Sequence, residues 1–109
     1  MHAQDLLAYQ VLLRDRAAIA DLITSLLGPL TQARGGAQPL LDTLAAYFAA
    51  GSNTAQASRE LHLSVRAVTY RLDRVRALTG ANPASPRDAF ALHAAVLGAR
   101  LLGWPAQPL

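Results

Sequence analysis

Apolar residues recur along this chain at the three- and four-residue spacing of amphipathic helices, and no stretch shows the strict alternation of a half-buried strand. Capping and breaking residues divide the pattern into separate helical segments. These segments are predicted to run over residues 5–13, 15–27, 39–50, 54–61, 64–79 and 86–102. The predicted fold class is therefore all-α, a small helical domain in which Gly and Pro separate the helices.

Local residues set the ends of several of these helices. Asp15 can cap the second helix, and Gly28-Pro29 is expected to end it. Pro39 suits the first turn of the third helix, and Ser85 can cap the last one. The residues expected to be buried in the second and third helices are Ile19, Leu22, Ile23, Leu26, Leu27, Leu41, Leu44, Ala45 and Phe48.

The last helix carries more apolar residues than one face can hold. One face is predicted to hold Phe90, Ala94, Leu97 and Leu101. The surface is widened by Leu92, Val96 and Leu102. The sequence leaves open whether this surplus packs in the core or forms a dimer surface.

Residues 52–80 read as two short helices joined by a tight turn. Asn53 or Thr54 can cap the first helix, and Ser64 is placed to cap the second. His62-Leu63 makes the turn, and the small Ser58 stands where two crossing helices leave little room. This pattern is typical of a helix-turn-helix that reads DNA.

The second helix of this pair has one apolar stripe and one arginine-rich face. Val68, Leu72 and Val75 fall at i, i+4 and i+7 and must face the core. The opposite face and its flanks then carry Arg66, Thr69, Tyr70, Arg71, Asp73, Arg74 and Arg76. Four arginines within eleven positions favour a binding face over an ordinary solvated one.

The positive charge is concentrated in the second half of the chain. Residues 1–50 hold three Arg and four Asp, whereas residues 51–109 hold seven Arg and three acidic residues. This location favours a phosphate-bearing partner for the two-helix segment. All ten basic residues are Arg, which a GC-rich coding sequence also produces, so the location of the charge is the stronger evidence.

The sequence offers no catalytic, metal or cofactor site. The three His are scattered without ligand spacing, the acidic residues form no close carboxylate pair, and no Gly-rich loop follows a strand. No apolar run approaches the ~18 residues that cross a membrane, and the first five residues lack the basic region of a secretory signal. The absence of Cys is compatible with a reducing compartment. We therefore predict a non-enzymatic, cytoplasmic protein without a membrane partner.

Several short stretches of this chain form one combined pattern. They are Leu41-Asp42-Thr43-Leu44, Tyr47-Phe48, Gly51-Ser52-Asn53, Arg59-Glu60-Leu61-His62-Leu63, Tyr70-Arg71-Leu72, Leu78-Thr79-Gly80 and Pro86-Arg87-Asp88. Together they resemble one family, the C-terminal helix-turn-helix of PucR/CdaR-type bacterial transcriptional regulators. The resemblance covers roughly residues 28–102, and the opening of the second helix departs from it. There this chain has Ser64-Val65-Arg66-Ala67 in place of a His-Arg-Asn-Thr-like tetrad, so base contacts of the family are not carried over.

The resemblance implies a support helix, a positioning helix, a recognition helix and a C-terminal helix, preceded by one or two N-terminal helices. It also implies a transcription regulator that binds double-stranded DNA as a homodimer on near-symmetric sites. Residues 1–34 would then be the tail of an upstream regulatory part with its flexible Gly-rich linker, and residues 35–109 the DNA-binding domain. The chain is accordingly expected to be a fragment, with any effector bound by a missing upstream domain.

The candidate DNA contacts follow from position on the two helices. The N-terminal part of a recognition helix penetrates deepest, so Arg66, Thr69 and Tyr70 are the candidates for base edges. Ser64 opens that helix at the groove, and the candidates for phosphates are Asn53, Thr54, Arg59, Arg71 and Arg74.

The alternative function is a helical protein-interaction or dimerisation module that binds no DNA. In that case the arginine face would meet an acidic protein, and the wide apolar face of residues 90–102 would meet a second copy.

Overall fold

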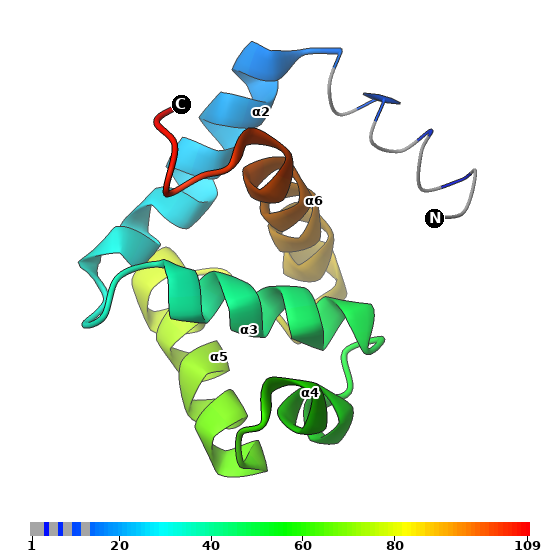
Figure 1. The fold of residues 1–109 in the computed structure, drawn as a ribbon, viewed down its shortest axis with the longest axis vertical. Coiled ribbons are helices and arrows are strands. Elements are labelled where there is room, and N and C mark those ends of the chain that lie inside the picture. The colour runs from blue at the N-terminus through cyan, green and yellow to red at the C-terminus, as the bar shows by residue number, and fades with distance from the viewer. Residues whose placement is uncertain (1–3, 5–6, 8–9, 12–13) are drawn as a thin grey trace.

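The computed structural model describes residues 4, 7, 10, 11 and 14–109. Its helices are α2 (Arg16–Leu22), α3 (Gln38–Ala49), α4 (Thr54–Leu61), α5 (Val65–Thr79) and α6 (Pro86–Leu102), with a π-helical segment η1 (Ile23–Leu27) and a 3-10 segment η2 (Gly28–Gln32) between α2 and α3 (Figure 1). Within this part of the chain there is no strand, which confirms the all-α prediction. The helix predicted over residues 5–13 lies mostly outside the described residues.

The N-terminal helical segment begins as predicted but continues further than predicted. Asp15 caps α2, because its Oδ1 accepts a hydrogen bond from the backbone N–H of Ala18 at 2.9 Å. The helical run ends at Leu27 with Gly28 at its C-cap, as predicted, but the chain winds on from there in the 3-10 segment η2 to Gln32. Pro29 stands in the first turn of η2, where its missing N–H has no helical partner to lose. Only residues 33–37 remain as the connection to α3.

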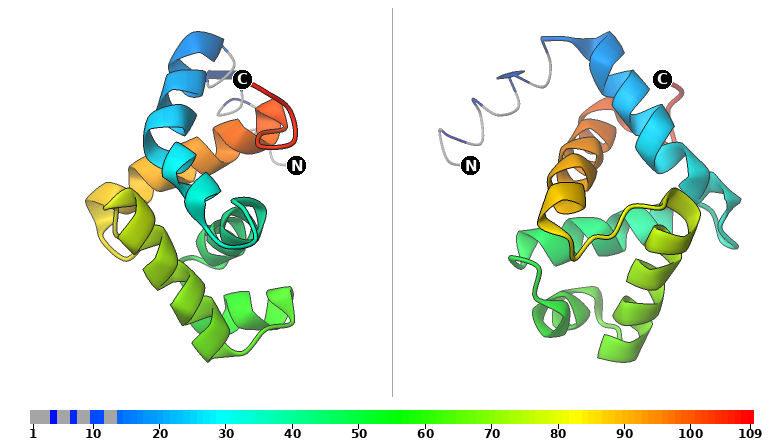
Figure 2. Two further views of the ribbon diagram at one scale, coloured as in Figure 1. Left: turned by 90° about the vertical axis from the view of Figure 1, so that its left-hand side faces the viewer. Right: turned by 180° about the vertical axis from the view of Figure 1, so that it is seen from behind.

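One hydrophobic core joins this segment to α3, α5 and α6. Ile19, Ile23 and Leu27 are buried as predicted, whereas Leu22 and Leu26 are half-buried at its edge. Figure 2 shows α2, η1 and η2 passing beside α6 and down toward α5. The core therefore crosses residue 34, and the domain boundary there stays a prediction.

The support helix α3 buries a slightly different face from the one predicted. Leu41 and Leu44 are buried, but Ala45 and Phe48 are only half-buried. The remaining inner positions are Leu40, Thr43 and Tyr47. Phe48 stacks on the His93 ring of α6, with the centroids 4.9 Å apart and the planes at 25°. Partial burial lowers the pKa of the His93 imidazole, so the ring favours its neutral form in this contact.

The predicted inner face of α6 is wrong. Phe90 is 79% exposed, and Ala94, Leu97 and Leu101 are half-buried. The buried residues are Leu92, Ala95, Val96, Gly98, Ala99 and Leu102. Because α6 is apolar on nearly every side, the spacing of its apolar residues does not indicate which face is buried. In the structure, the small residues at positions 95, 98 and 99 allow α2 and η1 to pack closely against it. The surplus residues Leu92, Val96 and Leu102 thus lie in the core of the chain and are not available as a dimer surface.

The start of α6 also differs in detail from the prediction. Ser85 occupies the capping position, but its side chain makes no capping hydrogen bond. Asp88 in the first turn accepts a hydrogen bond from the backbone N–H of Asn82 at 2.9 Å, which ties the preceding loop to the helix. No helix in the described part of the chain combines the length and the apolar character needed to span a membrane.

At Gly98, α6 packs closely against the N-terminal segment. A Cβ added there would lie 2.6 Å from Cγ2 of Ile19, well inside van der Waals contact. Ile is β-branched and stiff at χ1 in a helix, so its Cγ2 cannot swing aside cheaply. We expect Gly98→Ala to lower the free energy of unfolding by about 1–3 kcal/mol in denaturant titrations.

Gly28→Ala is the matched control for that measurement. A Cβ at Gly28 meets nothing within 4 Å, and its backbone has helical dihedrals, with φ −49° and ψ −46°. Its substitution should leave stability unchanged or raise it by up to about 1 kcal/mol, because Ala favours helix over Gly. A Gly98→Ala variant as stable as Gly28→Ala would contradict the close packing of α2 on α6.

Candidate nucleic-acid interface

The two short helices α4 and α5 are both capped by the residues that the sequence predicts. Oδ1 of Asn53 accepts a hydrogen bond from the Gln56 backbone N–H at 2.9 Å. Oγ of Ser64 accepts one from the Ala67 backbone N–H at 3.0 Å. Each cap leaves a donor free in principle for a ligand, the side-chain amide of Asn53 and the hydroxyl hydrogen of Ser64.

The turn between the helices is tight and uses a left-handed residue. His62 ends α4 with φ 56° and ψ 40°, a left-handed conformation that is uncommon for residues other than Gly but that His, like Asn and Asp, adopts more often than most. The next residue returns to α4, since the backbone N–H of Leu63 donates to the carbonyl of Ser58 at 2.9 Å. Ser58 is only 5% exposed, and its Oγ donates to the Ala55 carbonyl at 2.6 Å. The small side chain and its satisfied hydroxyl therefore fit the crowded site that the sequence predicts.

The predicted apolar stripe of α5 faces inward. Val68 and Val75 are fully buried and Leu72 is half-buried. Val68 packs with Tyr47 of α3 and Ala57 of α4 in a small cluster of its own. This packing fixes the outward direction of the opposite face.

That outward face carries the residues expected to read bases. Arg66, Thr69 and Tyr70 are exposed, Tyr70 by 65%, and Asp73 is exposed beside them. Arg71 and Arg74 are half-buried on one flank of the helix. At 100° per residue, Thr69, Asp73 and Arg76 turn toward the other flank.

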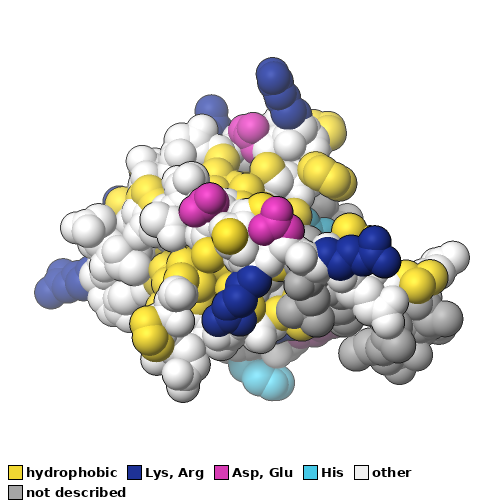
Figure 3. All heavy atoms as spheres, turned by 90° about the horizontal axis from the view of Figure 1, so that it is seen from above, with side chains coloured by type: hydrophobic (Ala, Val, Ile, Leu, Met, Phe, Trp, Pro, Cys, Tyr) yellow, Lys and Arg dark blue, Asp and Glu magenta, His cyan; other side chains and the backbone are white. Residues whose placement is uncertain are grey.

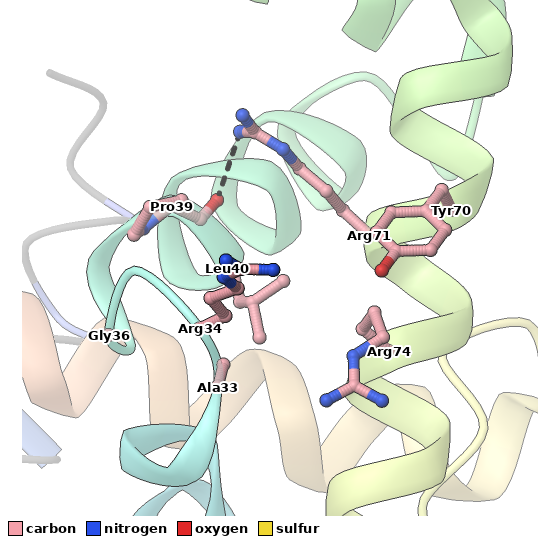
Figure 4. Close-up of a pocket in the computed structure, with 8 residues that line it drawn as sticks. All are labelled: Ala33, Arg34, Gly36, Pro39, Leu40, Tyr70, Arg71 and Arg74. Atoms are coloured by element: carbon pink, nitrogen blue, oxygen red, sulfur yellow. Dashed lines mark hydrogen bonds between the residues drawn. The ribbon is translucent and has the colours of Figure 1, made fainter.

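A recess lies along each flank of α5. The recess on the α4 side has a volume of about 150 Å³ and brings Thr54 of α4 beside Thr69, Asp73 and Arg76. The recess on the other side is larger, about 420 Å³, and is shown in Figure 4. Its lining residues come from α5, from the start of α3 and from the connecting loop: Ala33, Arg34, Gly36, Pro39, Leu40, Tyr70, Arg71 and Arg74. We call this second recess the arginine pocket.

Arg71 is anchored to the support helix. Its Nη1 donates to the Pro39 carbonyl at 3.4 Å and to Oγ1 of Thr43 at 3.3 Å. Thr43 is fully buried, and its own hydroxyl donates to the same Pro39 carbonyl at 2.8 Å. Both contacts of Arg71 use one nitrogen of a group with five N–H donors, so the guanidinium is oriented and retains donors for a ligand.

The structure places most of the predicted residues on or beside α5, and it places one further arginine there that the sequence pattern did not indicate. Arg59 is exposed in the last turn of α4 and lines neither recess. Arg34 was assigned to a flexible linker, yet it lies in the arginine pocket beside Arg74. No local pattern could reveal this placement, because the two residues are forty positions apart in the sequence.

Comparison with known proteins identifies the domain. The family described as the PucR C-terminal helix-turn-helix domain matches residues 40–97, which is more than half of the chain. The chain belongs to this PucR domain family. It carries the helix-turn-helix domain of a PucR-type transcriptional regulator, and this family is not one of enzymes.

Relatives of the PucR domain are longer proteins. Uncharacterized proteins of Mycobacterium tuberculosis and Mycobacterium bovis are 37% identical over 93 residues, which is 85% of this chain. The chain spans 22% of the length of these relatives. The crystal structure of a regulator of polyketide synthase expression from Bifidobacterium adolescentis superposes with a TM-score of 0.67 at 29% identity, over 93% of this chain and 41% of that one.

Ser58 offers a test of how the PucR helix pair is packed. We expect Ser58→Leu to destabilise the chain by about 1–3 kcal/mol and to abolish DNA binding, because the larger side chain must push α4 away from its neighbours. Ser58→Ala is the control, since it removes only one hydrogen bond and should cost at most about 1 kcal/mol. Thermal unfolding and duplex titration together measure both effects. An unchanged melting temperature with full DNA affinity in Ser58→Leu would rule out this packing role.

Proposed function

We propose that this PucR-type domain binds double-stranded DNA in a sequence-specific manner, with the N-terminal part of α5 in the major groove and α4 bracing it across the backbone. The observation that carries the proposal is the exposed face of α5. It presents Arg66, Thr69 and Tyr70 outward, while the buried stripe of the same helix is held by α3 and α4. A helix fixed in this way can present side chains to base edges without first becoming ordered.

The predicted residues divide into base readers and phosphate contacts. Arg66 in the first turn of α5 suits a guanine edge, since its planar fork can donate to O6 and N7 together. Thr69 and Tyr70 lie one turn later on the same face. On the α4 side, Asn53, Thr54 and Arg59 would contact phosphates of one strand, while Arg71 and Arg74 would contact the other, and Ser64 opens the recognition helix at the groove.

The regulatory context remains part of the proposal. The Bifidobacterium adolescentis structure is named a regulator of polyketide synthase expression, which supports a role in transcription regulation here. The resemblance to the family supports three further parts of the proposal. These are binding as a homodimer to near-symmetric sites, an effector bound by an upstream domain, and a cytoplasmic location. The alternative, a protein-interaction module, loses support because Leu92, Val96 and Leu102 are buried within the chain.

The arginines of α5 should separate base reading from phosphate binding. Arg66→Ala should cost roughly 1–3 kcal/mol on the preferred site and relax sequence preference at one base position. Arg74→Ala should weaken binding to all sequences alike and reduce the slope of log K against log salt by about one unit. Titrations of both variants against a specific and a scrambled duplex, at several salt concentrations, measure the two effects.

Two outcomes would count against these assignments. Equal losses on both duplexes for Arg66→Ala would remove Arg66 from the base readers. Absence of salt-dependent duplex binding by the unmodified chain, with binding to an acidic protein instead, would favour the interaction module.

A further inference from the structure

We propose that the arginine pocket binds a backbone phosphate of the DNA duplex and that Arg34, from the loop before α3, is one of its ligands. This inference rests on the proposed DNA-binding function and extends it to a residue outside the segment that matches the family domain, residues 40–97.

The composition of the pocket calls for an anion. Three of its eight lining residues are arginines and none is acidic. Figure 4 shows Arg34 and Arg74 reaching from opposite sides into one opening, with Tyr70 beside them. Like charges held close together repel one another, and this repulsion is relieved when an anion sits between them. The arrangement is thus complementary to a ligand with several negative oxygens.

The chemistry of the lining residues favours phosphate. Guanidinium groups donate paired, parallel hydrogen bonds that match the oxygens of a phosphate. The Tyr70 hydroxyl adds a neutral donor at the same opening. Arg71 also lines the pocket and is already oriented by Pro39 and Thr43, so less side-chain freedom is lost when it binds.

The position of the pocket indicates where the phosphate comes from. A helix in the major groove lies between two sugar-phosphate backbones, so each of its flanks faces one of them. On the α4 side of α5, Thr54 and its neighbours line the smaller recess. The arginine pocket occupies the opposite flank, formed by Arg71 and Arg74 of α5 itself. A duplex docked on the exposed face of α5 would therefore bring the second strand to this opening.

The loop that carries Arg34 is built to hold it in place. The backbone N–H of Ala33 donates to the Leu30 carbonyl at 3.1 Å, and that of Gly36 donates to the Ala33 carbonyl at 2.9 Å. Gly35 and Gly36 have φ of 92° and 82°, in the left-handed region that glycine adopts without strain. Leu30, at the start of this turn, is fully buried in the main core. Arg34 is thus displayed on a short, hydrogen-bonded turn anchored to the core.

The test is the salt dependence of duplex binding by the 109-residue chain carrying Arg34→Ala. One phosphate contact contributes a slope of about 0.9, which corresponds to roughly five-fold in affinity at 0.15 M salt. We expect a loss of this size, equal on specific and scrambled duplexes, with a slope reduced by about one unit. Arg34→Lys keeps the charge and should retain most of the slope.

Arg16→Ala is the matched control. Arg16 is also exposed and its removal changes the net charge equally, but it lies on α2, at the far end of the molecule from α4 (Figure 1). Its slope should equal that of the unmodified chain. If Arg16→Ala and Arg34→Ala lose the same affinity, the effect is one of net charge and the pocket assignment is overturned.

A double substitution tests whether Arg34 and Arg74 share one ligand. If they do, the loss for Arg34→Ala with Arg74→Ala should be smaller than the product of the two single fold-changes. Independent, multiplicative losses would overturn the shared site.

Two further outcomes separate this inference from the function on which it rests. Normal duplex binding by Arg34→Ala would overturn the pocket assignment and leave the DNA-binding function standing. No duplex binding by the unmodified chain would defeat both. A titration with inorganic phosphate, monitored by the NMR amide shifts of residues 33–37, tests whether the pocket binds a free anion instead. If the unmodified chain binds phosphate saturably, and Arg34→Ala abolishes this binding without changing the affinity for duplex DNA, the pocket is a site for a small anion. That result would overturn the assignment of its ligand to the DNA backbone.

Discussion

The interface depends above all on how the buried stripe of α5 is divided between two clusters. Val75 packs into the main core with the N-terminal segment and α6, whereas Val68 packs with Tyr47 and Ala57 in the smaller cluster. Leu72, between them, touches both clusters. A helix held at two separate points along its length cannot roll, because rolling would expose two fully buried valines, each worth about 1.5–3 kcal/mol when buried. The exposed face of α5 is thereby fixed for a partner.

Charge is arranged on this frame in an uneven way. On the face at the α2 end, arginines stand singly among acidic and apolar side chains (Figure 3). Beside α5, by contrast, three arginines meet in one pocket without a carboxylate among its lining residues. Holding Arg71 there has a desolvation cost, which its bonds to Pro39 and Thr43 partly offset. Three arginines in one pocket contribute little to the stability of the fold, so a bound anion explains this arrangement better than folding stability does.

The sequence predicted best those features that depend on neighbouring residues. Asn53 and Ser64 act within one turn of their own positions, and both begin a helix as expected. Which face of α6 is buried depends on residues distant in the sequence. Because α6 is rich in Ala and Leu on nearly every side, its pattern of apolar residues did not favour one face. Gly28-Pro29 ends η1 as expected, but the 3-10 segment that follows was not predicted, because a Pro that breaks one helix is tolerated in the first turn of the next. Arg34 was missed because only the folded chain brings the loop and α5 together.

The N-terminal segment completes the core that holds α5 and also positions Arg34 at the arginine pocket. The same packing is responsible for both. Ile23, Leu27 and Leu30 lie before the matched residues 40–97, yet all three are fully buried in the core that also holds Val75. They therefore belong to the same packed unit as α5. The 33–37 loop is only the short link between this buried segment and α3, so its course over the flank of α5 is set at both ends. Arg34 reaches the pocket for that reason: the packing that completes the core of the domain also places Arg34 and Arg74, from two different elements, around one opening.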